Sequence, residues 1–208
     1  MNAAMMHLGS ESEPRASRFS QYLVACNGLD RLRFKEWVFH PGMLFGSAEG
    51  WAGLATRDRL HEGVDFLLYR QRDGETFALT AKTRIPAMYD GEVVRIHNDF
   101  MGQSIWVKHA VSDGGGRRLC TAYGHTLPAP SLSVGDRVSE GEVIATVGDG
   151  NRKGLKVPPH LHLSVAWVSE DLPRDRFGWE AANDPRYVAL LDPLKLIACR
   201  YSIVGAAL

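Results

Sequence analysis

The sequence predicts a mainly β protein, built as an antiparallel β-sheet groove or a barrel- or sandwich-like domain. Two observations indicate this class: short runs of strand-forming residues, and turns rich in glycine and aspartate between them. Strands at this spacing favour antiparallel pairing over alternating βαβ units. With 208 residues, 45% of them hydrophobic, the chain can also bury a sizeable core. Short helical or irregular extensions are expected at both ends.

The strands are expected in a definite order. The segment 31–39 is rich in strand formers, although its alternation slips near Glu36, and a glycine-containing loop follows. One hairpin is expected around Asp73-Gly74, because this dipeptide favours a tight turn. Later segments complete the set: the strand pair 91–97 and 104–109, and the strands within 117–125, 138–148 and 160–168.

Two other segments are expected to lie outside the sheet. Residues 170–186 are predicted to form a polar loop, and residues 187–198 a short helix broken near Pro193. The resulting division is a leader and extension at 1–41, a main domain at 42–198 and a tail at 199–208. Within the leader, residues 1–18 are polar and expected to be loose.

Charge and composition restrict the possible partners. Lys plus Arg and Asp plus Glu both number 24, so nothing favours binding to nucleic acid or a membrane surface. No run approaches the ~18 apolar residues of a membrane span. The first residues also show no export signal. The three cysteines are odd in number and form no CxxC, which indicates small buried side chains rather than disulfides or a cysteine zinc site.

The eight histidines are the most informative feature of the sequence. His160 and His162 are expected on one strand, where residues i and i+2 share a face, so their side chains would converge. His61 and Asp65 form a second pair, and the chain must bend at Gly63 to bring both to one ion. Taken alone, each pair is also compatible with ordinary surface side chains, and His125 with a structural role.

Two imidazoles and one carboxylate form a recurrent catalytic zinc set, which leaves a fourth position open for water. Taken together and in order, HEGVDF at 61–66, YGH at 123–125 and PHLHL at 159–163 resemble the three motifs of the lysostaphin/LytM-type zinc peptidases. The glycine-rich stretch 134–150, the hairpin 91–109 and the Asp-Pro segment near 192–193 resemble further family features. The resemblance covers about residues 42–198.

This resemblance implies specific roles. His61, Asp65 and His162 match the family's zinc ligands, and His125 and His160 match its catalytic pair. The implied function is a zinc metalloendopeptidase that cleaves peptide cross-links of peptidoglycan, which would place the protein in the periplasm or at the cell surface. Zn²⁺ would lower the pKa of its bound water towards ~7, and either catalytic histidine could take the proton. No HExxH motif occurs, so no glutamate base is indicated.

Alternatives remain open at this point. A catalytically silent relative could bind cell wall or activate an amidase, and a lipoyl- or biotin-carrier-like domain would share the turns of 134–150. The long 65–91 spacing could wall the groove through its hairpin, and the basic residues of 151–156 could contact substrate. His7, His40, His97 and His109 are expected to be surface or structural, and Trp51 and Trp106 to pack in the core rather than line a groove.

Overall fold

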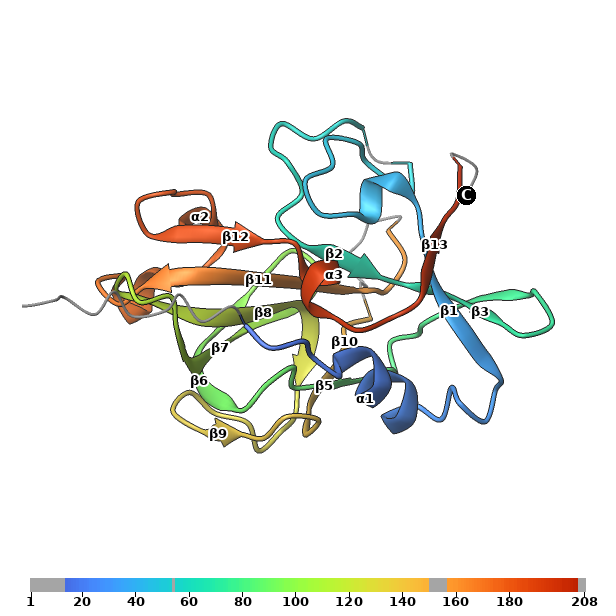
Figure 1. The fold of residues 1–208 in the computed structure, drawn as a ribbon, viewed down its shortest axis with the longest axis horizontal. Helices are drawn as coiled ribbons and strands as arrows, with labels where there is room; N and C mark the ends of the chain where they lie inside the picture. Colours follow the sequence, from blue (N-terminus) through green and yellow to red (C-terminus); the bar gives the residue numbers. More distant parts are fainter. Residues whose placement is uncertain (1–13, 54, 150–156, 206–208) are drawn as a thin grey trace, which may run out of the picture.

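The computed structural model describes residues 14–53, 55–149 and 157–205. The described chain forms two β-sheets with short helices beside them (Figure 1). The mainly β, largely antiparallel class is therefore confirmed, and the sheets do not close into a barrel. Residues 1–13, which are most of the segment 1–18 expected to be loose, and the basic segment 151–156 lie outside the described residues.

The larger sheet carries most of the strands predicted from residue 91 onward. Its main path runs β12-β11-β8-β7-β6-β9, with antiparallel neighbours throughout, and further strands join it at the sides. Strand β2 pairs with β11, and β10 pairs with both β8 and β5. The bounds are β2 (Val64–Phe66), β5 (Arg84–Pro86), β6 (Gly91–Asn98), β7 (Gln103–Ser112), β8 (Arg117–Pro128), β9 (Arg137–Val138), β10 (Val143–Val147), β11 (Leu161–Ser169) and β12 (Val188–Leu191).

The smaller sheet has the order β13-β1-β3-β4. Strands β3 (Leu68–Gln71) and β4 (Thr76–Ala78) form the hairpin predicted around Asp73-Gly74. Strand β1 (Phe34–Phe39) pairs antiparallel with β3, and its register shifts between Phe34 and Glu36, where the alternation of the sequence slips. On its other side β1 pairs in parallel with β13 (Tyr201–Ile203), so the sheet joins segments from both ends of the chain.

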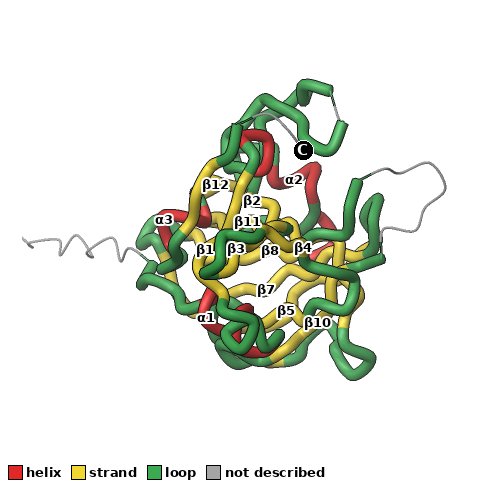
Figure 2. Tube along the Cα trace, turned by 90° about the vertical axis from the view of Figure 1, so that its right-hand side faces the viewer, coloured by secondary structure: helices red, strands yellow, loops and turns green. Residues whose placement is uncertain are grey.

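An aromatic cluster lies at the centre of the main core. The Phe66 ring packs edge to face against Phe19, Trp37 and Phe39, with ring centroids 5.9, 5.1 and 5.5 Å away. Phe19 opens helix α1 (Phe19–Cys26), so the N-terminal extension packs into the same core as the sheets. Figure 2 shows the strands gathered inside the molecule, with loops and short helices around them.

The prediction that residues 170–186 form a polar loop is wrong. It contains a 3₁₀ turn, η2 (Arg174–Arg176), and a short helix, α2 (Trp179–Ala182), and its apolar side chains cover the second face of the larger sheet. Phe177 is buried there against Trp106, with ring centroids 5.8 Å apart. The segment reads as polar because its charged residues outnumber the few apolar side chains that make the contact.

The expected helix over 187–198 is also partly wrong. Residues Val188–Leu191 form the edge strand β12, and only Pro193–Leu196 are helical, as α3. Pro193 starts this helix instead of breaking one, because proline lacks an amide hydrogen that the first helical position would leave unpaired. Asp192 caps the helix by accepting the Leu194 backbone N–H at 3.0 Å.

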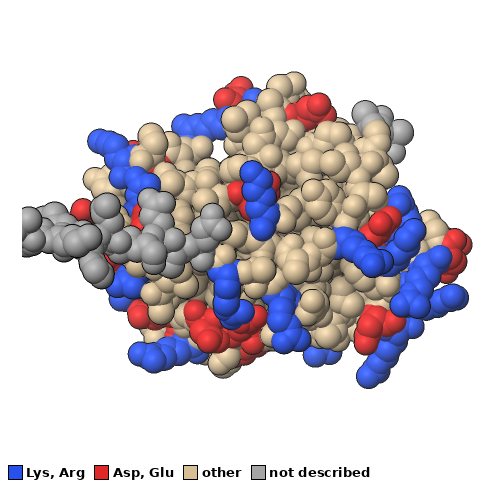
Figure 3. All heavy atoms as spheres, in the orientation of Figure 1, with Lys and Arg blue, Asp and Glu red and all other residues tan. Residues whose placement is uncertain are grey.

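The three cysteines are free thiols, with Cys120 buried and the other two partly buried. On the face drawn in Figure 3, acidic and basic side chains intermingle around the rim and leave much of the centre uncharged. No helix among the described residues is long and apolar enough to cross a membrane.

His109 has the structural role predicted for it. It is buried on β7, where Nδ1 donates to the Asp90 carbonyl oxygen at 2.8 Å and Nε2 is hydrogen-bonded to the Thr121 hydroxyl at 3.0 Å. Burial lowers the pKa of His109 to about 4, although the Asp90 carbonyl partly opposes this. The imidazole is therefore neutral in the folded protein at pH 5 to 7.

This burial predicts a dependence of stability on pH. In the unfolded chain the His109 pKa is ~6.5, so between pH ~6.5 and about 4 the unfolded state binds one more proton at this site. Stability should fall as pH drops through that window, by up to roughly 3 kcal/mol from this group. Urea unfolding at several pH values should give a shallower loss for His109→Gln than for the unchanged protein. Parallel curves for the two proteins would contradict the assignment.

Candidate metal centre and active site

Strand register builds the candidate site. In β11, His162 lies directly opposite Asp65 of β2 on one side and Gly124 of β8 on the other. Directly paired residues of antiparallel strands have Cβ atoms ~4.5–5.5 Å apart, so Asp65 and His162 meet without any special loop. His160 lies two residues before His162 on the same face, and Leu161 between them is fully buried, as the strand geometry predicts.

His61 reaches this pair from the loop before β2. Its Nε2 lies 3.2 Å from Asp65 Oδ1, so the chain bends between the two residues as expected. Gly63 is needed there for space: an added Cβ would lie 2.4 Å from the Leu163 carbonyl oxygen and 2.7 Å from His162 Nε2. The bend therefore lies against the backbone of β11 with no room for a side chain.

Three possible ligand atoms converge at the floor of the site. Asp65 Oδ1 lies 2.9 Å from His162 Nδ1, and His61 Nε2 lies 3.0 Å from the same nitrogen. His61, Asp65 and His162 form a group that could hold a metal ion. Ligands of a tetrahedral ion with bonds of ~2.0–2.1 Å lie about 3.3 Å apart. The observed spacings are only slightly shorter, and the donor set of two imidazoles and one carboxylate suits zinc.

The outer nitrogens of the two imidazoles have hydrogen-bond partners of their own. His61 Nδ1 is 3.1 Å from the Leu44 carbonyl oxygen, which can only accept, so Nδ1 carries the proton and Nε2 is free to bind a metal. His162 Nδ1 is hydrogen-bonded to Asp65 Oδ1 at 2.9 Å, so a metal ion would take the place of the proton between these two atoms, and the ring would then carry its proton on Nε2, 2.9 Å from the Ser164 hydroxyl. Such outer partners orient metal-binding histidines in many proteins.

Asp65 is held in a similar way. The Trp51 indole N–H donates to Oδ2 at 2.6 Å, and Arg57 Nη2 lies 3.7 Å from the same oxygen, so Oδ1 is left to face the histidines. Burial alone would raise the pKa of Asp65, but the surrounding histidines hold it well below its usual value. Burial also lowers the pKa of His162, against the opposing effect of Asp65. An ionised Asp65 and a neutral His162 are protonation states that metal binding requires.

His160 lies beside this cluster. Its Nδ1 is 2.9 Å from the Pro158 carbonyl oxygen, so that nitrogen carries the proton, and Nε2 lies 3.7 Å from Asp65 Oδ1 with its lone pair toward the site. Burial lowers the His160 pKa to about 4, although Asp65 partly opposes this. The ring is thus neutral near pH 7 and able to accept a proton.

His125 enters the site through a β-bulge. Opposite Ser104, strand β8 carries one extra residue, because Gln103 pairs with Thr126 and Ile105 with Tyr123. Within this bulge His125 has φ +62°, a left-handed conformation that is uncommon for residues with a side chain. Bulges redirect side chains at functional sites. Here the bulge places the His125 ring 4.8 Å from that of His160 and 5.9 Å from that of His162.

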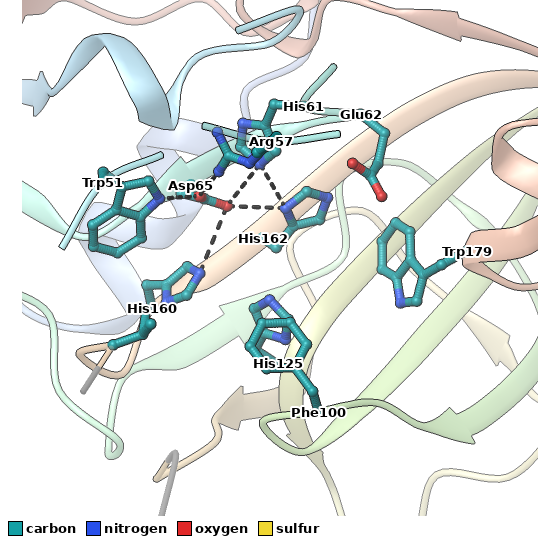
Figure 4. A pocket seen from close by; sticks show the side chains of 11 residues that line it. Trp51, Arg57, His61, Glu62, Asp65, Phe100, His125, His160, His162 and Trp179 are labelled. Atoms are coloured by element: carbon teal, nitrogen blue, oxygen red, sulfur yellow. Dashed lines mark hydrogen bonds and ion pairs between the residues drawn. The ribbon is translucent and has the colours of Figure 1, made fainter. Parts of the chain in front are cut away.

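All five predicted residues line one cavity of about 300 Å³, together with Trp51, Phe100 and Trp179 as aromatic walls (Figure 4). Trp51 is buried, as predicted for a core residue, but its indole also lines the cavity and bonds Asp65. Trp106 packs among the buried apolar side chains on the second face of the larger sheet, as predicted for a core residue. No residue of the β3–β4 hairpin borders the cavity, so the prediction that it walls the groove is not supported.

Sequence reasoning missed several residues of the site. Ser164, Trp179 and Asp99, whose carboxylate accepts the His125 backbone N–H, carried no motif. Leu44 contributes only a backbone oxygen. Trp179 lay inside the segment predicted as a polar loop, yet its ring stands nearly perpendicular to that of His162, with centroids 4.9 Å apart. The large apolar side chains within this mainly charged segment, Phe177 and Trp179, were an available signal.

One known protein family matches this chain. Residues 70–173, half of the chain, match the sequence model of peptidase family M23. The chain belongs to peptidase family M23. The matched M23 segment includes His125, His160 and His162 but begins after His61 and Asp65. The structure brings those two residues to the M23 segment through the pairing of β2 with β11.

Three of the solved structures that align with this chain are LytU, Csd3 and lysostaphin. LytU aligns with TM-score 0.44 and 23% identity over 77% of this chain and 81% of its own. Csd3 of Helicobacter pylori aligns with TM-score 0.46 and 21% identity, over 79% of this chain and 34% of Csd3. Lysostaphin, known from Staphylococcus simulans, aligns with TM-score 0.47 and 21% identity, over 89% of this chain and 54% of the lysostaphin chain. The M23 chain thus spans about a third of Csd3 and half of lysostaphin. No curated protein gives a significant match.

Proposed function

We propose that the chain is a zinc-dependent endopeptidase that hydrolyses peptide cross-links of bacterial peptidoglycan. Membership of family M23 supports a hydrolase acting on peptidoglycan. One observation carries the proposal of a metal-dependent reaction. His61 Nε2, His162 Nδ1 and Asp65 Oδ1 converge, and each group is held from its far side by a hydrogen-bond partner of its own.

In this proposal His61, Asp65 and His162 hold the ion, and His125 and His160 act beside it. Bound zinc would supply a Lewis acid for the scissile carbonyl and lower the pKa of a water molecule. His160 Nε2, unprotonated and facing the cluster, can take up a proton or, once protonated, donate a hydrogen bond to the developing oxyanion. His125 can do the same from the other side.

The walls of the cavity assist these steps. Trp51 packs edge to face against His160, with ring centroids 4.8 Å apart, and Phe100 packs against His125 at 4.5 Å. These contacts fix both imidazole rings and replace water along their outer faces. Electrostatic interactions of the reacting groups are stronger where water is excluded.

The direct test is turnover of defined cross-linked muropeptides by the zinc-loaded protein. The expected result is a new free amine and a split of the cross-linked dimer in mass spectrometry, lost on chelation and restored by added zinc. A protein that binds purified peptidoglycan but never cleaves it would instead be a catalytically silent wall-binding or amidase-activating relative. Cleavage that persists without any metal would contradict the proposed mechanism.

A further inference from the structure

We propose that Asp99 is a positioning residue for His125: its carboxylate holds this histidine in one orientation and one tautomer, so that His125 presents an unprotonated Nε2 to the reaction. This inference rests on the proposed function and concerns a residue that none of the three sequence motifs contains. It follows from the hydrogen bonds of a carboxylate buried in the turn between β6 and β7 (Figure 4 shows His125 in the cavity).

The Asp99 carboxylate is the anchor of this corner of the site. Its side chain is 2% exposed, and both oxygens are occupied. Oδ2 accepts the His125 backbone N–H at 2.8 Å and the Ser104 hydroxyl at 2.7 Å. Oδ1 accepts the Met101 backbone N–H at 2.9 Å. A group with these partners has a fixed position, which it can impose on its neighbours.

Asp99 holds His125 at two points. Its bond to the backbone N–H acts on the residue whose φ is +62°, and Gly148 N–H donates to the His125 carbonyl oxygen at 2.7 Å from the other side. The left-handed conformation is thus secured at both ends of the residue. Oδ1 also lies 3.3 Å from His125 Nδ1, within ion-pair distance of a buried nitrogen that makes no hydrogen bond among the described residues.

A carboxylate beside one imidazole nitrogen decides which nitrogen carries the proton. An ionised carboxylate only accepts hydrogen bonds, so it favours Nδ1–H and leaves the lone pair on Nε2. Burial would raise the pKa of Asp99, but the His125 ring, the Ser104 hydroxyl and the His125 backbone N–H hold it well below its usual value. Asp99 therefore stays ionised, and Nε2 is left to accept a proton inside the cavity.

Ser104 links the Asp99 carboxylate to Trp179 in the cavity wall. The Ser104 hydroxyl donates to Asp99 and accepts the Trp179 indole N–H at 3.0 Å. Trp179 itself packs against His162. Asp99 thus aligns His125 with the wall that also contacts a proposed metal ligand.

The test compares Asp99→Asn with Asp113→Asn in the zinc-loaded protein. Asp113 is a matched control, because its Oδ1 also accepts two backbone N–H groups, from Gly115 and Arg117, but in the turn at the opposite end of β8. An asparagine at 99 presents either a neutral oxygen or an amide donor to His125 Nδ1, and the donor favours the wrong tautomer. By analogy with such a change in a serine protease triad, kcat should fall by roughly 10²–10⁴-fold.

Three readouts separate positioning from a structural role. Asp99→Asn should retain zinc, keep KM within about threefold and lose kcat, whereas Asp113→Asn should keep both kinetic constants. Long-range ¹H–¹⁵N NMR, with the His125 signal assigned by its loss in His125→Gln, should show Nδ1–H in the unchanged protein. Unchanged kcat in Asp99→Asn, or zinc loss that accounts for its whole defect, would overturn the proposal.

The NMR measurement stands without turnover and without a folded variant at position 99. If the protein cleaves no muropeptide, the proposed function fails, and the tautomer of His125 still tests Asp99. An Nε2–H tautomer in the unchanged protein would refute the positioning role even in an active enzyme. Nδ1–H in the unchanged protein and its loss in Asp99→Asn would support it.

Discussion

Replacing His162 with alanine is expected to abolish stoichiometric zinc binding. The change removes one of three proposed ligands, and the neighbouring Asp65 oxygen and His61 nitrogen, 2.9 and 3.0 Å from His162 Nδ1, lose the atom that completes the set. Structural and catalytic zinc sites need at least three protein ligands to hold the ion tightly. In His61→Ala and Asp65→Ala, the zinc content should likewise fall from about one ion per chain to a small fraction of that.

A graded series makes this prediction sharper. Ser164→Ala removes only the hydroxyl that is 2.9 Å from His162 Nε2, so zinc should remain but bind roughly 10–100-fold more weakly. His97→Ala, in a half-buried histidine of β6 outside the cavity, is the control and should keep full occupancy. Elemental analysis gives the zinc occupancy of each variant, and competition with a chelator gives its zinc affinity. Full zinc retention by His162→Ala would exclude the ligand assignment.

Replacing His160 or His125 with alanine is expected to have the opposite pattern: zinc stays and turnover is lost. Neither residue belongs to the converging group of possible ligands, yet both rings face it in the same cavity. A positioned acid or base contributes typically 10²–10⁴-fold to rate, so each variant should lose roughly that factor in kcat. Steady-state turnover of a cross-linked muropeptide, together with zinc analysis of the same sample, checks both halves.

The two variants also test each other. If the histidines act in one step as a pair, the double variant should be little worse than the more damaged single variant, since residues that act as a unit are not additive. Near-normal turnover in either single variant would show that this residue is misassigned. Loss of zinc from His160→Ala would instead make it a ligand.

The part of the site that could be predicted depends on local pattern. His160 and His162 share a face because strand geometry alternates, and this follows from five consecutive residues. The hairpin at Asp73-Gly74 follows from turn chemistry in the same way. The shape of the β8 bulge could not be predicted, because nothing in YGH shows that His125, and not the preceding Gly124, takes the left-handed conformation.

The remaining parts of the site depend on contacts between distant segments. Asp99 and His125 are 26 positions apart, and Trp51 and Asp65 are 14 apart, so their hydrogen bonds exist only once the sheets are assembled. The segments 170–186 and 187–198 were mispredicted for a related reason. Phe177 and Val188 find apolar partners on the second face of the sheet, which their own neighbours in sequence do not reveal.

The parallel pairing of β1 with β13 has a consequence for how the molecule is made. Trp37 aligns with Tyr201, and the Ser17 backbone N–H donates to the Leu196 carbonyl oxygen at 2.7 Å. These N-terminal segments therefore cannot complete their hydrogen bonds until the C-terminal segment has been synthesised. During synthesis the ribosome releases residues 34–39 long before 201–203. The edge of β1 must therefore stay open, or be shielded by another factor, until translation has passed Ile203. Nascent chains stalled before that point should be far more sensitive to protease than those stalled well after it.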